Sequence, residues 1–151
     1  MAPSFFSLIA KGLRAYPESL GLEMVRKHLA FQPLWAFEAR LKERDGLLWR
    51  QQALVEGAQN LLGVLAGVNH LYYSTFQFKR MGDFISQMEH KPRQLYERLT
   101  AMLSGSEAAS VIFHELVEEV ADLAERRMPD VDLTTVRRQL ARVERSWQIS
   151  A

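Results

Sequence analysis

Residues 54–72, LVEGAQNLLGVLAGVNHLY, place apolar side chains at intervals of three and four residues and then break that pattern. The apolar positions are Leu54, Ala58, Leu61, Leu62, Leu65 and Val68. This spacing is typical of the buried face of an α-helix. Asn69 and Tyr72 come next on the same face, where an amide and a phenol must be hydrogen-bonded in the core or line a cavity. The stretch therefore predicts a central helix, from about Leu48 to His70, with a polar feature at its end.

Proline and glycine divide the rest of the chain into further helices and leave little room for strands. We expect helices over about residues 17–29, 33–44, 48–70, 79–88, 92–103 and 106–127, and a last one with Leu133, Val136, Leu140, Val143 and Trp147 facing inward. The prediction is an all-α, single-domain, up-and-down bundle of about six or seven helices over residues 16–151. Residues 1–15 are expected to form an N-terminal arm or a short helix.

Three glycines, Gly57, Gly63 and Gly67, interrupt the long central helix. Glycine is less favourable than alanine inside a helix by about 1 kcal/mol. We therefore interpret these positions as places where a neighbouring helix approaches closely.

Composition excludes several classes of protein. A chain of 151 residues is long enough to bury one core without covalent staples. The absence of cysteine excludes disulfides, thiolate chemistry and cysteine-bound metal, and it favours a cytoplasmic location. A formal charge of +1 argues against nucleic-acid binding, and no segment is apolar enough over a sufficient length to predict a membrane partner.

A family resemblance rests on residues 67–73, GVNHLYY, on residues 76–80, FQFKR, and on the helix start near Pro92. Together with residues 15–20, AYPESL, these motifs resemble the C-terminal helical half of bacterial DUF4037-type proteins. Those proteins are similar to aminoglycoside and kanamycin nucleotidyltransferases, in which a catalytic head precedes an all-helical substrate-binding domain. The resemblance spans roughly residues 16–103 and implies a substrate-binding half that faces a nucleotide-binding head.

The motifs of a catalytic head are missing from the chain. Such a head needs a Gly-Ser pair that seats a triphosphate and paired aspartates that hold magnesium. Here the pair at residues 105–106 precedes Glu107 and is typical of a helix cap, while Asp132 of the Asp130-Val131-Asp132 run is a plausible N-cap. The sequence therefore predicts no catalytic residues, no cofactor and no catalysis by this chain alone.

Two clusters of polar residues favour ordinary surface roles. His114 and Glu118 lie one turn apart, but a zinc-binding helix of this kind needs a second histidine at the later position, so no metal site is expected. Arg137, Arg138 and Arg142 fall on the outer face of an amphipathic helix, where nearby acidic residues can offset them.

The candidate substrate-binding residues are Asn69, Tyr72, Tyr73 and Lys79. An amide, two phenols and one mobile cation are suited to a polar small molecule, or to a phosphate presented by a separate catalytic subunit. The resemblance places them at the cleft between the helical half and the head. The alternative is structural: Asn69 caps the long helix, Tyr72 and Phe76 are core residues, and Lys79 opens the next helix.

Two functions follow from these patterns. The first is a non-catalytic substrate-binding module that acts with a separate nucleotidyltransferase head, and an exposed groove lined by the four candidate residues would favour it. The second is a homodimeric or partner-binding protein that uses the last helix, where Val136 and Leu140 belong to a pattern close to a heptad seam. Packing of that helix on its own chain is the competing interpretation.

Overall fold

The computed structural model describes residues 15–143, and every regular element within that range is helical. The elements are α2 (Glu18–His28), η1 (Leu34–Ala36), α3 (Glu38–Glu43), α4 (Leu47–Val68), η2 (Thr75–Arg80), α5 (Met81–Ser86), α6 (Leu95–Leu103), α7 (Ala109–Arg127) and α8 (Thr134–Leu140), where η denotes a 3-10 helix. The prediction of a helical bundle is confirmed. None of these helices combines the length and apolarity that crossing a membrane requires. Trp147 and nearly all of the expected N-terminal arm lie outside the described residues.

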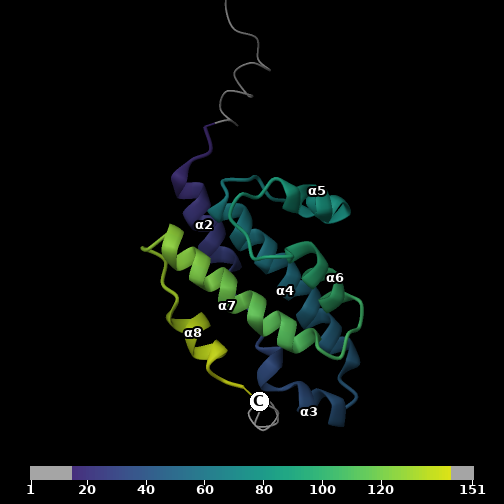
Figure 1. Cartoon of the computed structure of the whole chain (residues 1–151). Coiled ribbons are helices and arrows are strands. Elements are labelled where there is room, and N and C mark those ends of the chain that lie inside the picture. Colours follow the sequence, from purple (N-terminus) through teal and green to yellow (C-terminus); the bar gives the residue numbers. More distant parts are fainter. Residues whose placement is uncertain (1–14, 144–151) are drawn as a thin grey trace, which may run out of the picture.

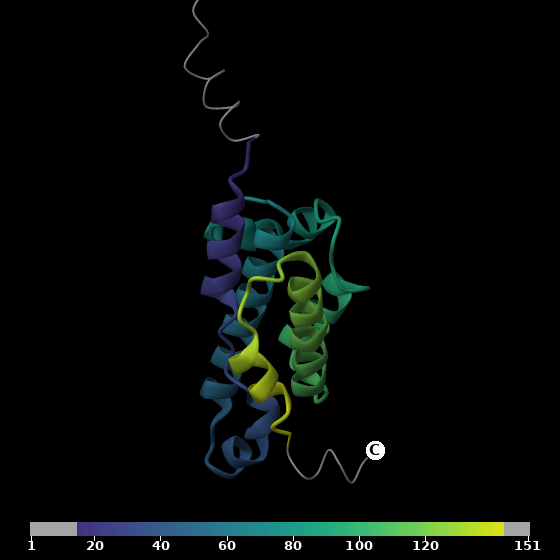
Figure 2. The same cartoon turned by 90° about the vertical axis from the view of Figure 1, so that its left-hand side faces the viewer.

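The longer helices alternate in direction along the chain, from α2 through α4 and α6 to α7 (Figure 1). Helix α4 is central and packs against α2, α6 and α7. Figure 2 shows α2 and α4 on one side of the molecule and α7 on the other. Because α4 and α7 run in the same direction, their C-terminal ends lie at one end of the bundle, beside the first turn of α2.

One hydrophobic core joins the helices. It includes Val25, Leu34, Trp35, Leu54, Leu61, Leu65, Leu99, Phe113, Leu116 and Val120. Trp35 is fully buried, packs edge-on against Phe113, and donates from Nε1 to the carbonyl oxygen of Gln139 over 3.0 Å. Val136 and Leu140 of α8 are only 2% and 7% exposed. The last helix therefore packs on its own chain.

The glycines of α4 lie where neighbouring side chains and backbone come very close. A Cβ atom on Gly67 would lie 2.6 Å from the carbonyl oxygen of Gly21, and one on Gly63 would lie 2.3 Å from the ring of His28. At Gly57 the obstacle is the ring of Phe113, 2.4 Å away. These contacts confirm that the glycines mark close approach, and two of them bring α2 against α4.

Two of the expected helices are each divided into two pieces. The chain leaves helical geometry at Phe37 (φ −143°), between η1 and α3. The two pieces pack differently, since η1 contacts both α7 and α4 whereas α3 contacts α4. The helix expected over residues 79–88 is likewise a 3-10 turn, capped by Ser74 and Gln77, followed by the short α5.

Candidate functional site: a polar groove at one end of the bundle

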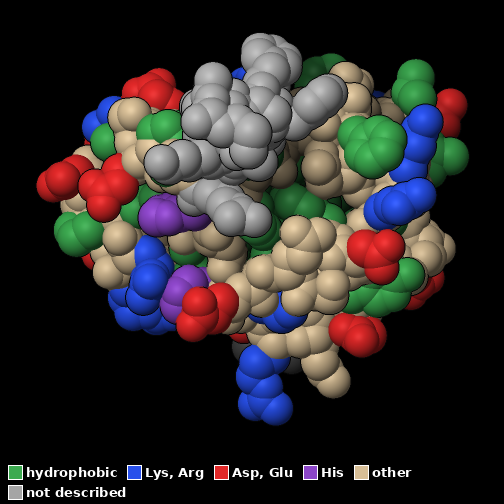
Figure 3. Space-filling view, turned by 90° about the horizontal axis from the view of Figure 1, so that it is seen from above, with side chains coloured by type: hydrophobic (Ala, Val, Ile, Leu, Met, Phe, Trp, Pro, Cys, Tyr) green, Lys and Arg blue, Asp and Glu red, His purple; other side chains and the backbone are tan. Residues whose placement is uncertain are grey.

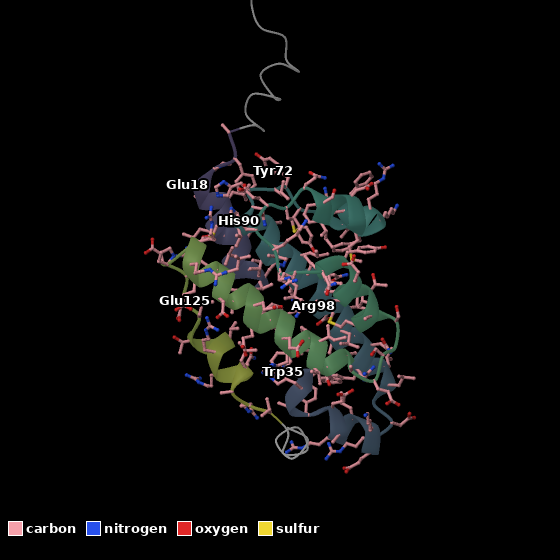
Figure 4. The ribbon with its side chains drawn as sticks, viewed as in Figure 1. Glu18, Trp35, Tyr72, His90, Arg98 and Glu125 are labelled. Atoms are coloured by element: carbon pink, nitrogen blue, oxygen red, sulfur yellow. The ribbon has the colours of Figure 1, made fainter. Side chains whose placement is uncertain are left out.

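An open groove lies where the C-terminal ends of α4 and α7 meet the first turn of α2. Its volume is about 520 Å³, within the usual range for small-molecule sites. Four segments line it: α2 contributes Glu18 and Leu22, and the others are residues 68–70, 87–90 and 127–130. Figure 4 shows Glu18 and His90 at this end of the molecule, with Trp35 far down the bundle.

Asn69 joins two walls of the groove. It is the C-cap of α4, and its Nδ2 donates to the carbonyl oxygens of Leu65 and His90, both at 2.8 Å. Its Oδ1 accepts from the backbone N–H of His90 at 2.7 Å. Both amide hydrogens are therefore used inside the protein. The function of this side chain in the fold is to hold the turn at His90 against the end of α4.

His70 lies just after the end of α4 in a backbone conformation that favours glycine, with φ at 55°. The N–H of His70 bonds to Gly67 and that of Leu71 to Ala66, the pattern of a Schellman motif. A non-glycine residue at such a position costs about 1 kcal/mol. The imidazole lines the groove and stacks on Tyr16, with ring centroids 5.2 Å apart and planes only 4° from parallel.

Four of the twelve lining residues are charged, and carboxylates are in excess: Glu18, Glu89 and Asp130 against the guanidinium of Arg127. Within the described residues, Glu18, Asp130 and Arg127 form no ion pair, and Glu89 lies 3.9 Å from Nε2 of His90. The C-terminal ends of α4 and α7 add partial negative charge, which the partial positive charge at the N-terminal end of α2 offsets in part. Figure 3, which views this end, shows histidine side chains beside acidic and basic ones. The groove therefore favours positively charged ligand groups.

The four predicted site residues do not share one pocket. Asn69 lines the groove, whereas Tyr73 packs edge-on against His28 and donates its hydroxyl to the carbonyl oxygen of Gln59 over 2.6 Å. Burial raises the pKa of Tyr73 well above its usual value. Lys79 is exposed on η2 and does not line the groove.

Tyr72 lies near the groove without lining it. Its ring contacts that of Tyr16, with centroids 5.0 Å apart, and Tyr16 in turn stacks on His70. Burial, with a smaller contribution from Tyr72, raises the pKa of Tyr16. The alternative prediction that Asn69 caps the long helix is correct, since Asn69 is the C-cap of α4. The prediction that Tyr72 and Phe76 are core residues is wrong, because they are 40% and 64% exposed.

Sequence reasoning missed most of the groove, including Glu18, His90, Arg127 and Asp130. No spacing along the chain relates these residues. The available signal was topological: in a bundle whose helices alternate in direction, the start of one helix and the ends of others meet at one end. Polar residues at those termini were therefore candidates to share a surface.

The two clusters that were expected to be ordinary surface differ in outcome, because Glu115 and Glu118 are exposed whereas His114 is half-buried against Trp35. His114 Nε2 lies 2.9 Å from the carbonyl oxygen of Leu140, and no cluster able to hold a metal ion exists among residues 15–143. Arg137 bridges Asp122 and Glu125, each at 2.7 Å, as expected for a solvated helix face.

Asp132 is bonded locally at the start of α8. Its carboxylate accepts from the N–H of Thr134 at 2.9 Å. Hydrogen bonding to the side chain of Thr134, and to a smaller extent to its backbone N–H, lowers the pKa of Asp132. The N-cap of α8 is Leu133 and not Asp132 as expected, so Asp132 satisfies an N–H of the first turn from one residue further upstream.

Comparison of the chain with protein-family models, curated proteins and solved structures finds no match. The resemblance to the helical half of nucleotidyltransferases therefore stays a hypothesis, and the groove must be interpreted from its own chemistry.

Proposed function

We propose that the chain is a non-catalytic binding module that holds a polar, amine-bearing small molecule in the groove. The observation that supports this most strongly is the excess of unpaired carboxylate in a hollow of about 520 Å³. An ammonium group at Glu18 or at Asp130 would make charge-assisted hydrogen bonds that these carboxylates lack among the described residues.

The rest of the lining suits a hydroxylated ligand. His70, His90 and Gln87 offer both donors and acceptors, and Leu22 and Val68 supply apolar wall. A few polar groups that orient a ligand above an apolar floor are typical of small-molecule sites. Amino sugars combine ammonium groups with hydroxyls that such a lining can bind, whereas polyamines offer ammonium groups on an apolar chain.

The sequence resemblance supports the same ligand class, because the substrates of aminoglycoside nucleotidyltransferases are amino sugars. On this proposal a separate head subunit supplies the nucleotide, and the ammonium group of the exposed Lys79 contacts a phosphate of that nucleotide. Asn69 acts by positioning His90, and Tyr72 acts by supporting Tyr16 behind His70. Tyr73 has only a structural role.

A thermal-shift titration tests the proposal. Spermidine and kanamycin should raise the melting temperature of the wild-type chain by mass action, and ATP with magnesium should not. Glu18→Gln and Asp130→Asn remove charge from exposed groove positions, so we expect both variants to fold normally and to lose most of the shift. Glu43→Gln on α3, at the other end of the bundle, is the matched control and should keep it. Absence of any shift in the wild type, or an equal shift in all variants, contradicts the proposal.

A partner-binding function is the second candidate. The surface predicted for it on the last helix is not available, because Val136 and Leu140 are buried in the core of the chain. The observation that favours this function lies on α4 instead, where Leu48 is 83% exposed.

A further inference from the structure

The groove holds side chains of both charge signs without pairing them. Arg127 and three carboxylates line the same hollow, yet Arg127 forms no ion pair among the described residues. Elsewhere beside α7 the opposite holds, because Nη2 of Arg137 lies 2.7 Å from carboxylate oxygens of both Asp122 and Glu125. The guanidinium of Arg127 is therefore available to a ligand in the groove, as the carboxylates are.

The turn that follows α7 presents both signs on one wall of the groove. Arg127 is the last residue of α7, and Asp130 follows it three positions later. The N–H of Met128 bonds to the carbonyl oxygen of Ala124 at 2.7 Å, and that of Val131 to the carbonyl oxygen of Met128 at 3.1 Å. These backbone bonds hold the turn, so a guanidinium and a carboxylate are offered side by side. Such a wall matches a ligand that has a carboxylate and an ammonium group close together.

We propose that the amine bound in the groove also carries a carboxylate, as a basic amino acid does, and that Arg127 binds this carboxylate. The inference rests on the proposed function, because Glu18 and Asp130 bind the ammonium groups in both. Arginine presents its N–H groups in a planar fork that matches the two oxygens of a carboxylate. Arg127 is therefore the residue that distinguishes an amine with a carboxylate from an amine without one.

The charge balance of the groove favours a carboxylate over a phosphate as the acidic group. Carboxylates exceed guanidinium in the lining, so a ligand with a net positive charge complements it. A basic amino acid meets this condition, because it has two ammonium groups and one carboxylate. A phosphate carries about −1.5 to −2 charges at neutral pH, which the carboxylates of the groove would repel. Leu22 and Val68 supply apolar wall for the methylene groups of such a ligand.

Dissociation constants of lysine and cadaverine, measured by NMR titration of the isotope-labelled chain, are the test. The two ligands have the same chain and the same two ammonium groups, and cadaverine lacks only the carboxylate. We expect the wild type to bind lysine about tenfold more tightly, the gain from one charge-assisted pair. Arg127→Gln should lose this preference and still bind cadaverine.

The matched control is Arg126→Gln. It removes the same charge from the preceding residue of α7, which lines a different hollow, so the preference for lysine should remain. Both arginines are exposed, and the circular dichroism and melting temperature of both variants should stay close to those of the wild type.

The outcomes separate this inference from the proposed function. If cadaverine and kanamycin bind but lysine binds no more tightly than cadaverine, the carboxylate site is overturned and the amine site stands. A preference for lysine that survives in Arg127→Gln overturns the assignment to Arg127. If none of the three ligands binds, the proposed function fails, and the inference fails with it.

Discussion

The amide of Asn69 shows how one polar side chain at a helix end can connect two segments. It makes hydrogen bonds to Leu65 and to both backbone groups of His90. We expect Asn69→Ala to lower the free energy of unfolding by about 2 kcal/mol, because it leaves the backbone of His90 without partners. Urea unfolding checks this, and an unchanged midpoint would show that water replaces the amide at no cost.

Alkaline pH should weaken the fold through Tyr73. Its pKa is raised by burial, so the unfolded chain releases the phenolic proton first, near pH 10. Below that pH the contribution to stability is complete, and above it stability falls as the pH rises. Tyr73→Phe loses the hydrogen bond to Gln59, at about 1 kcal/mol, but cannot titrate. The wild type should therefore be more stable than Tyr73→Phe at pH 8, and this difference in the free energy of unfolding should become smaller as the pH rises to 11. Urea unfolding over this pH range checks the prediction. A difference in the free energy of unfolding that stays constant with pH would mean that Tyr73 has the same pKa in the folded and unfolded chains.

At the scale of elements, the contact of α2 with α4 depends on the absence of side chains at Gly21 and Gly67. Alanine at position 67 gains about 1 kcal/mol of helix propensity, but its Cβ would lie 2.6 Å from the carbonyl oxygen of Gly21. Overpacking of this kind costs about 1–3 kcal/mol, and the obstacle here is backbone, which yields little. We expect Gly67→Ala to be destabilising overall by thermal or urea unfolding.

The matched control for this prediction is Gly82→Ala. A Cβ there would lie 3.4 Å from the ring of Tyr96, an ordinary contact, so the helix gain should dominate and stability should be unchanged or higher. If Gly67→Ala and Gly82→Ala changed the free energy of unfolding equally, the contact between α2 and α4 at Gly67 would not be tight.

Helices are predicted well from the sequence where one apolar face is continuous. They are predicted poorly where tertiary contacts interrupt a helix. Helices α2 and α4 begin and end within about two residues of the expected positions, because proline, glycine and apolar spacing all agree there. The break at Phe37 had no such local signal. It follows from Trp35 packing against Phe113 while Glu38 pairs with Arg50, and neither partner is close in sequence.

At the scale of the whole molecule, the groove is a product of topology. Its lining comes from four segments that are distant in sequence, and local patterns along the chain could identify only Asn69. The aromatic and basic residues that follow α4 break the apolar pattern of that helix, but most of them lie outside the groove. The groove instead uses charged residues such as Glu18 and Arg127, which look like ordinary surface residues until α2, α4 and α7 are placed together.

The most direct test of the account is to map the amide resonances of the isotope-labelled chain during a titration with kanamycin. The proposal predicts saturable shifts concentrated at Leu22, Asn69, His70, His90 and Met128, which come from all four walls of the groove. Amides at the other end, such as that of Trp35, should stay unchanged. No saturable shifts, or shifts centred on a different surface, would contradict the claim that this groove is a binding site for amines.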